Sequence, residues 1–152
     1  MNAIELLKED HERVDRLFQK VKANEDGDNS DLARQISEEL TIHTHIEETI
    51  FYPRLLEEGD EELKKIVEEG IEEHRGVKNL IREIANLTDG SEKLQPKLTV
   101  MMENVEHHVM EEEGEMFQMV EEQFDAETLD ELGAEMEEEK ATFERSSAAS
   151  GG

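Results

Sequence analysis

Apolar residues recur at helical spacing through four long segments, and this pattern constrains the fold more than any other feature of the chain. The segments cover about residues 2–23, 32–58, 61–87 and 92–124. Each carries an apolar stripe at intervals of three and four residues, which is typical of a helix with one buried face. Only two prolines and nine glycines stand among the 152 residues. The pattern predicts an all-α protein in which four amphipathic helices face one another as an up-down bundle.

Two prolines and one further apolar stripe refine this prediction. Pro53 is expected to kink the second segment or end its regular part, whereas Pro96 is tolerated in the first turn of the fourth. A shorter fifth helix is expected over about residues 126–143, where the apolar side chains again share one face. It should pack against the outside of the bundle. Its stripe consists of Leu129, Leu132, Met136 and Phe143.

The chain is therefore expected to form one domain with an appended helix. We assign a four-helix bundle to residues 1–124, an accessory helix to residues 125–145 and a disordered tail to residues 146–152. The tail sequence, SSAASGG, consists of small residues that offer no apolar face for packing.

Charge and composition exclude several classes of function. The chain carries 42 acidic and 16 basic residues, a formal net charge of -26, so it should repel nucleic acid and anionic membrane surfaces. It has no cysteine, which excludes disulfides and thiolate metal sites. No apolar run approaches the length of a membrane span. These features predict a soluble, cytoplasmic protein without a nucleic-acid or membrane partner.

The two halves of the chain contain a weak internal repeat. The segment DHERVDRLF, from residue 10, matches EHRGVKNLI, from residue 73. The segment HTHIEETIFYP, from residue 43, matches HVMEEEGEMFQ, from residue 108. Each half is therefore a helical hairpin that carries one histidine on its first helix and the pattern H-x-x-x-E on its second.

Helical geometry places these histidines and glutamates on the buried faces. Residues four apart on an α-helix are separated by about 40° around the axis, so Glu47 lies on the same face as His43. Apolar residues such as Leu40 and Ile46 surround that pair, and the second repeat places His108 with Glu112 in the same way. The histidines of the first and third helices also lie within their apolar stripes. The predicted inward set is His11, His43, Glu47, His74, His108 and Glu112.

Six buried ionisable groups predict bound metal. Unpaired buried charges cost several kcal/mol each, roughly, and Lys78 is the only basic residue near this set that could face inward. A cation offsets that cost. Imidazole and carboxylate suit iron, manganese or zinc, and six donors exceed what one structural zinc ion takes. Two ions that share bridging carboxylates, as in a di-iron centre bridged also by oxide, hydroxide or water, use six donors and leave positions open for a small diatomic ligand or peroxide.

These residues resemble the hemerythrin-like family, also called the HHE cation-binding domain, over about residues 4–124. The order H, H-x-x-x-E, H, H-x-x-x-E is complete, and the flanks EETIFYP and HHVMEEEGEMF are similar to those of the family. The resemblance implies a four-helix bundle around a non-haem centre of two iron ions, an architecture for which myohemerythrin is a standard example. The family's ligand pattern falls on the six residues given above.

The resemblance also shapes the functional alternatives. Oxygen-carrying hemerythrins have H-x-x-x-H on the third helix, whereas Lys78 stands four residues after His74, which argues against reversible oxygen carriage. Related bacterial members resemble proteins that handle oxygen, nitric oxide or peroxide. Others act in iron sensing or in the repair of iron clusters, and the repair type usually carries a cysteine-bearing segment that this sequence lacks.

Several neighbouring polar residues compete for roles at the site. On a straight helix His45, Glu48 and Tyr52 project away from the centre, and His107 points about 100° aside from His108. Tyr52 is expected to pack against the fifth helix or a loop, although its phenolate would reach a ferric ion if the helix were overwound there.

Two carboxylates are candidates for contacts behind the ligands. Glu115 lies close enough to the buried stripe to accept a hydrogen bond there. Asp15, one turn after His11, could orient that imidazole through its second ring nitrogen.

Two classes of function remain from the sequence. The first is a di-iron protein that binds or turns over oxygen, peroxide or nitric oxide, with peroxide consumption as the enzymatic version. The second is an iron-responsive sensing or structural metal-binding module without turnover, for which the fifth helix would serve as the signalling element. A third reading, in which the histidines are only hydrogen-bonded core residues, leaves six convergent ionisable groups unexplained.

Overall fold

The computed structural model describes the backbone of residues 1–151 and the side chains of residues 1–146. It is all-helical over that part of the chain, which confirms the predicted fold class. The elements are α1 (Ala3–Lys22), α2 (Ser30–Ile46), η1 (Glu47–Phe51), α3 (Tyr52–Glu58), α4 (Glu61–Ala85), α5 (Leu94–Glu111), η2 (Glu112–Met116), α6 (Phe117–Gln123) and α7 (Ala126–Gly151). Among these helices, none is both long enough and apolar enough to cross a membrane.

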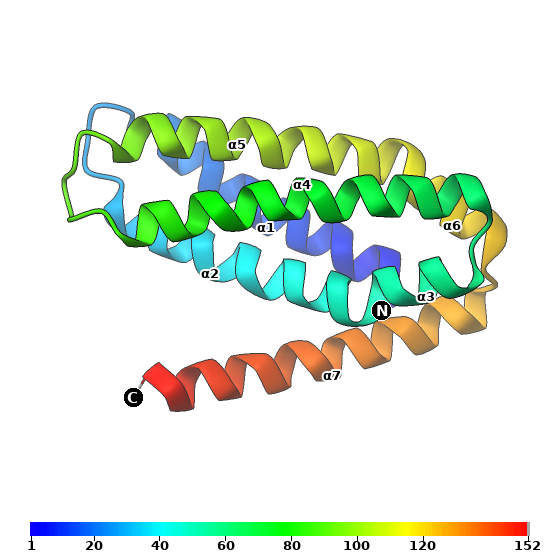
Figure 1. The fold of residues 1–152 in the computed structure, drawn as a ribbon. Helices are drawn as coiled ribbons and strands as arrows, with labels where there is room; N and C mark the ends of the chain where they lie inside the picture. Colours follow the sequence, from blue (N-terminus) through cyan, green and yellow to red (C-terminus); the bar gives the residue numbers. More distant parts are fainter. Residues whose placement is uncertain (152) are drawn as a thin grey trace.

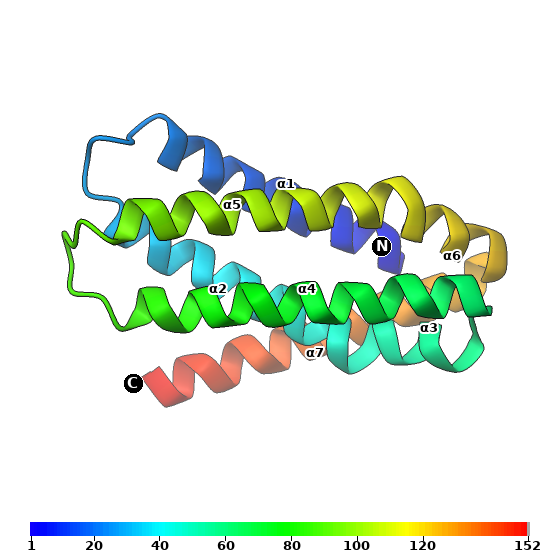
Figure 2. The same ribbon diagram turned by 45° about the horizontal axis from the view of Figure 1, so that its top comes forward.

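Four long helical columns make up the bundle, and neighbours in sequence run antiparallel (Figures 1 and 2). The columns are α1, then α2 with η1 and α3, then α4, then α5 with η2 and α6. Helix α7 runs back along the outside of the bundle beside α1 and α2 (Figure 1). The two sequence repeats thus form two helical hairpins that pack face to face.

Polar side chains fix where several helices begin. Asn2 and Glu5 form a reciprocal capping box at the start of α1, in which each side chain accepts a hydrogen bond from the other residue's backbone N–H. Asp60 accepts a hydrogen bond from the N–H of Leu63 and starts α4. These caps fix the chain direction at the starts of two columns.

Each of the second and fourth columns contains one π-helical turn, which divides the long helix that the sequence predicted there. The N–H of Tyr52 bonds to the carbonyl of Glu47, and the N–H of Phe117 bonds to the carbonyl of Glu112. Pro53 is the second residue after the first π turn, as expected from a residue that cannot complete the regular bonding pattern. The second π turn has no proline beside it, so proline alone does not explain the pair. Both turns begin at a glutamate predicted to face inward.

The buried core consists of two apolar clusters with a polar layer between them. One cluster joins the ends of the columns near α7, where Phe51, Leu55 and Phe117 are packed with the accessory helix. The other lies toward the loops that connect the helices within each hairpin, where Phe18, Ile36 and Leu98 are fully covered. Four histidines and two glutamates fill the layer between the two clusters. The bundle therefore encloses a polar centre with apolar packing on both sides.

Helix α7 packs through the face that the sequence predicted. Leu129, Leu132 and Met136 are buried in the first cluster. Gly133 lies so close to the chain start that a Cβ there would be 2.2 Å from the carbonyl oxygen of Met1, so only glycine fits. The helix continues to Gly151, well past Phe143, where the apolar stripe led us to expect its end. The predicted disordered tail covers residues 146–152, whose side chains lie almost entirely outside the described part of the structure. Its disorder stays a prediction.

Candidate metal centre

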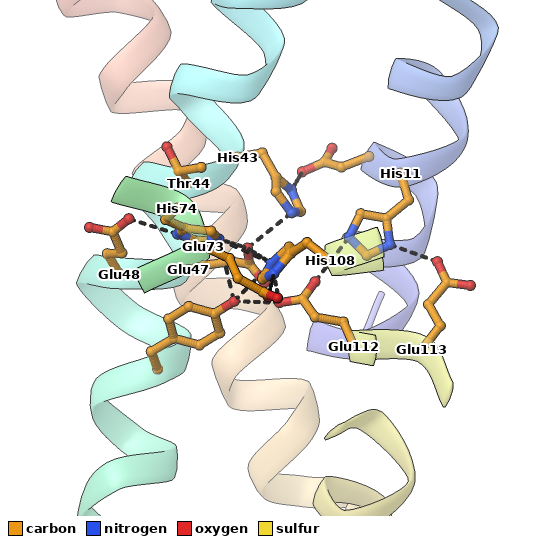
Figure 3. A network of polar contacts seen from close by, with 12 residues as sticks. His11, His43, Thr44, Glu47, Glu48, Glu73, His74, His108, Glu112 and Glu113 are labelled. Atoms are coloured by element: carbon orange, nitrogen blue, oxygen red, sulfur yellow. Dashed lines mark hydrogen bonds and ion pairs between the residues drawn. The ribbon is translucent and has the colours of Figure 1, made fainter. Parts of the chain in front are cut away.

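The six residues predicted to face inward meet in the polar layer, one or two from each column (Figure 3). All six are at most 8% exposed, and Glu47 is fully covered. They come from α1, α2, η1, α4, α5 and η2, in the order His11, His43, Glu47, His74, His108 and Glu112. Helical spacing thus predicted their convergence correctly, while their role as ligands stays a prediction.

The two glutamates lie between the histidines of different helices. The Oε1 atom of Glu47 is 3.1 Å from Nε2 of His43 and 3.0 Å from Nε2 of His74. The Oε1 atom of Glu112 is 3.1 Å from Nε2 of His11, and its Oε2 atom is 3.3 Å from Nε2 of His108. Each carboxylate therefore links one histidine from each hairpin.

Each histidine also contacts a second carboxylate on its outward side (Figure 3). The four Nδ1 atoms lie 2.6–3.0 Å from carboxylate oxygens, which places one acid behind each imidazole. The pairs are His11 with Glu113, His43 with Asp10, His74 with Glu48, and His108 with Glu73. When Nδ1–H donates to the carboxylate, Nε2 keeps its lone pair toward the centre, the arrangement that metal-binding histidines use.

These outer carboxylates follow the internal repeat. Asp10 and Glu73 directly precede the first histidine of each half, and Glu48 and Glu113 directly follow the inward glutamate. Neither pair was assigned from the sequence. The sequence does contain a clue to these four carboxylates, because an acidic residue adjoins the same histidine or glutamate of the motif in both repeats.

The buried histidines and carboxylates shift one another's pKa values. Although burial opposes protonation, the neighbouring Glu47 and Asp10 carboxylates raise the pKa of His43 to about 10. Burial likewise opposes the shift at His108, whose pKa is raised well above its usual value by Glu112 and Glu73. Against its own burial, the pKa of Glu112 is lowered well below the usual range by the imidazoles. The carboxylates thus attract positive charge to this layer, either as protons on the imidazoles or as a metal cation in their place.

The donor set fits a metal cation. Within the described side chains, five buried polar atoms have no hydrogen-bond partner, and all belong to the inward set. They are Nε2 of His11, Nε2 of His43, both carboxylate oxygens of Glu47 and Oε1 of Glu112. Several of these atoms approach one another to about 3 Å without hydrogen-bond alignment. Two donors that each lie about 2.1 Å from one ion at a right angle are separated by about 3.0 Å, so the spacing suits shared coordination.

Within the inward set, two groups of donor atoms can each hold an ion. The first group combines Glu47, His74, His108 and Glu112, and the second combines His11, His43 and Glu112. Glu112 belongs to both groups, with one carboxylate oxygen directed to each. The geometry therefore accommodates two cations joined by a bridging carboxylate.

The structure overturns the straight-helix assignment of Tyr52. Its side chain is fully buried, and its hydroxyl lies 2.5 Å from Oε2 of Glu112 and 3.3 Å from Nε2 of His108. A π turn contains one more residue than an α turn, so η1 rotates Tyr52 back by roughly 100° toward the centre. Burial and the adjacent carboxylates raise the pKa of Tyr52 well above 10, so the hydroxyl keeps its proton and donates to Glu112.

Glu48 was also wrongly placed on the far side of its helix. It lies at the flank between the second column and α4, where its Oε2 atom is 2.7 Å from Nδ1 of His74. Its Oε1 atom accepts a hydrogen bond from Lys78 at 2.6 Å, so this lysine points to the outer carboxylate rather than into the centre. Despite partial burial, these two contacts lower the pKa of Glu48 to about 2.

Two further sequence assignments are corrected. Glu115 is exposed, and the residue that contacts the back of His11 is Glu113. Asp15 is exposed and accepts a hydrogen bond from Gln19 instead of orienting His11. The Asp15 error arises because the partner of His11 comes from η2 of the opposite hairpin, not from its own helix.

The remaining histidines lie outside the centre, as the helical geometry indicated. His45 pairs with Glu139 of α7 at 2.8 Å, and its ring lies 4.5 Å from that of Phe143 between centroids. His107 is 65% exposed and pairs with Glu111 at 2.6 Å. Neither ring reaches the inward donor atoms.

A cavity of about 490 Å³ opens beside the four histidines. Apolar side chains of α1 and α5 form much of its wall, including Val14, Phe18, Val105 and Val109. Its volume far exceeds the roughly 30 Å³ that one water molecule takes in the liquid. A small molecule therefore has room to reach the histidine side of the centre.

Comparison with known proteins places this geometry in a family. Residues 2–120 match the model of the hemerythrin HHE cation-binding domain. The crystal structure of an HHE cation-binding-domain protein from Mycobacterium kansasii superposes with a TM-score of 0.78 at 25% identity, over 98% of this chain and 91% of that chain.

Two relatives are similar in sequence. A DNA nickase from Nostoc sp. is 24% identical over 149 residues, which are 95% of this chain and 41% of the nickase. An uncharacterised hemerythrin-like protein of Schizosaccharomyces pombe is 29% identical over 105 residues, 68% of this chain and 52% of that protein. The chain thus spans about half or less of the length of these two relatives. Since the family model covers most of its residues, the chain belongs to the hemerythrin HHE cation-binding domain family, and its buried histidine–glutamate cluster can hold metal.

Proposed function

We propose that the chain holds two iron ions in the polar layer and uses them to bind or turn over a small oxidant, namely oxygen, peroxide or nitric oxide. The ligands would be the four inward histidines with Glu47 and Glu112. The main support is that every histidine directs Nε2 to the centre while its Nδ1 contacts a separate carboxylate. A buried core that only needed hydrogen bonds would not leave inward atoms unpartnered.

The choice of iron follows from donor chemistry. Imidazole with carboxylate is a donor set of intermediate to hard character, and paired ions bridged by carboxylates in a helical bundle are typical of di-iron proteins. Such ions supply redox chemistry and bind small oxidants at open positions.

The protein's own residues make the two ends of the centre unequal. The end at His74 and His108 has four donors, and the Tyr52 hydroxyl lies close to both imidazoles. The end at His11 and His43 has three donors, and the phenyl ring of Phe117 stacks on His11 at 6.1 Å between centroids. We infer that the open position for an external ligand lies at the second end.

Three features of this chain would serve that ligand. The apolar wall of the cavity admits a small neutral molecule and disfavours ions. The Tyr52 hydroxyl donates a hydrogen bond to Glu112 and so fixes the carboxylate that both donor groups share. The outer carboxylates hold the imidazoles in position during any change of charge at the centre.

Metal analysis and optical spectroscopy test the proposal. The protein loaded with ferrous iron and exposed to air should contain about two irons per chain, in keeping with the two donor groups, and should show the near-ultraviolet absorption of an oxo-bridged pair. Consumption of hydrogen peroxide well above the rate of free iron would then favour an enzyme over a reversible binder. One iron or none per chain would refute the two-ion centre.

Alanine variants test which residues bind the iron. Glu112→Ala should reduce bound iron at both ends, because this carboxylate is shared by the two donor groups. His43→Ala should reduce it at one end. His45→Ala is the matched control, since His45 lies on the same helix but contacts Glu139 of α7. Equal losses of iron in His43→Ala and His45→Ala would overturn the ligand assignment.

A second function, iron-responsive sensing without turnover, is favoured by one observation. Lys140 of α7 contacts Asp10, which lies behind His43, so the accessory helix is connected to the centre. In that case iron should raise the thermal stability of the protein while peroxide consumption stays at the level of free iron. We do not propose DNA cleavage by analogy with the Nostoc nickase, because the net charge of -26 opposes contact with phosphates.

A further inference from the structure

An ion pair from α7 reaches the back of one histidine in the centre. The Nζ atom of Lys140 donates to Oδ1 of Asp10 at 2.6 Å, and Nδ1–H of His43 donates to Oδ2 of the same carboxylate at 3.0 Å. The side chain of Asp10 is 5% exposed, and that of Lys140 is 19% exposed. Arg13 adds a contact to Oδ1 at 3.1 Å. A buried carboxylate thus connects the accessory helix to His43.

Helix α7 is held firmly enough to fix the position of Lys140. Leu132 and Met136, on the turns before it, are at most 1% exposed in the core cluster. Glu139, the residue before Lys140, pairs with His45 of α2 at 2.8 Å. These contacts place Lys140 over the junction of α1 and α2.

Among the described side chains, no lysine supports the equivalent carboxylate of the second repeat. Glu73 lies behind His108 at 2.6 Å, as Asp10 lies behind His43. Its side chain is 26% exposed, and its neighbours are His107 and Glu111 rather than a lysine of another helix. The accessory helix therefore acts on one end of the duplicated centre.

We propose that α7 is a positioning element of the metal centre: Lys140 holds Asp10 against His43, so that docking of α7 and metal binding at the His11–His43 end stabilise each other. The inference rests on the proposed function only in that these histidines bind metal. Lys140 touches no ligand atom and acts through Asp10. Because the coupling is a free energy shared by two sites, it must be reciprocal.

The physical basis is orientation of the imidazole. With Lys140 bound, Oδ1 of Asp10 accepts from both Lys140 and Arg13, so the carboxylate is held from two sides and presents Oδ2 to His43 in a fixed geometry. Without Lys140, Oδ1 keeps only Arg13, which is 35% exposed and also lies 3.6 Å from Glu9 and from Glu39. Asp10 is then less firmly held, and so are the tautomer and ring orientation of His43. Loss of a carboxylate behind a ligand typically costs about 10–100-fold in metal affinity, so loss of the residue that holds it should cost roughly tenfold or less.

The test uses the full chain and Co²⁺ as the probe, titrated against a competing chelator. Lys140→Met should weaken the binding of one of the two ions by about three- to tenfold and leave the other unchanged. Lys140→Arg should restore binding to within about twofold, since a guanidinium also pairs with a carboxylate. Lys97→Met is the matched control. Lys97 also makes an ion pair, with Glu83 at 2.9 Å, but this pair does not contact the centre.

Two readouts separate positioning from general stability. In the zinc-loaded protein, the ring NMR signals of His43 should change in Lys140→Met, while those of His108 stay as in the wild type. In the wild type, Co²⁺ should slow amide hydrogen exchange in residues 129–140, and this protection should shrink in Lys140→Met. The wild-type exchange measurement needs no variant and so does not depend on the folding of one.

The outcomes distinguish this inference from the proposed function. Absence of Co²⁺ and iron binding by the wild type would overturn both. Normal binding of two ions, with Lys140→Met indistinguishable from Lys97→Met, would overturn the coupling alone. Metal binding that leaves exchange in α7 unchanged would also overturn it.

Discussion

Replacement of Tyr52 by phenylalanine tests the π turn and the centre together. The tyrosine ring is fully buried beside Phe51, with 6.1 Å between centroids, and phenylalanine retains that packing. The change removes the hydroxyl that donates to Glu112 at 2.5 Å. The pKa of Tyr52 is raised well above 10 by burial and by Glu112, so the bond lost at neutral pH is that of a phenol to a carboxylate.

The expected loss of stability follows from this one bond. A hydrogen bond to a charged group contributes about 1.5–3 kcal/mol, and the Glu112 oxygen gains no water in exchange because the site is buried. No cavity penalty is added, since the ring volume is unchanged. A domain of this size loses roughly 2–4 °C of melting temperature per kcal/mol, so Tyr52→Phe should melt about 3–12 °C below the wild type.

The assay is urea unfolding of chelator-treated protein, followed by far-ultraviolet circular dichroism. The midpoint should fall while the slope of free energy against urea stays constant, which shows that the compactness of neither state has changed. A loss of less than about 0.5 kcal/mol, which is ordinary for a surface substitution, would refute the reasoning. The hydroxyl would then face elsewhere, and η1 would not rotate Tyr52 into the centre.

Three further predictions follow from other contacts. Glu113→Gln should lower metal affinity about 10–100-fold in a competitive titration, because Glu113 contacts Nδ1 of His11, whereas Glu115→Gln, at an exposed residue, should leave it unchanged. Gly133→Ala should destabilise the protein by about 1–3 kcal/mol or more in thermal unfolding, because the new Cβ would lie 2.2 Å from the Met1 carbonyl oxygen. The control is Gly76→Ala in α4, which has open space around it and should stabilise the protein by about 0.5–1 kcal/mol. Equal effects of the two changes would mean that α7 does not dock as described. Burial opposes protonation of His43, but Glu47 and Asp10 raise its pKa to about 10, so the stability that this group adds to the metal-free protein is complete below about pH 6.5 and is lost as pH rises toward 10. A metal must displace that proton, so metal affinity should rise between about pH 7 and 10 with proton release in calorimetry, and pH-independent binding would contradict it.

Local periodicity was sufficient to predict the inward set. His43 and Glu47 lie one turn apart in an apolar stripe, and the same spacing recurs at His108 and Glu112. A four-residue step keeps two side chains on one helical face regardless of how the helices later pack. For the same reason His45 and His107 were correctly placed outside the centre.

Contacts that depend on a change of helical pitch or on another helix were not predictable in this way. Tyr52 was assigned to the outer face because a straight α-helix was assumed, and the π turn that moves it has no clear signature in η1. The partners of the outer ring nitrogens come from neighbouring columns, as Glu113 does for His11. Spacing along one helix cannot identify such a partner, although the repeated acidic neighbours could have suggested candidates.

The duplicated hairpins each supply two histidines and one glutamate to the centre, yet the two ends that we propose to hold metal differ. One departure from the repeat makes the two ends differ. Tyr52 of the first repeat brings a hydroxyl to the His74–His108 end, while the corresponding Phe117 brings only a ring to His11. Because Phe117 lacks a donor group, nothing from that position competes with a ligand there. The Tyr52 hydrogen bond and the proposed open position can therefore coexist in one bundle, since they lie at different ends of the centre.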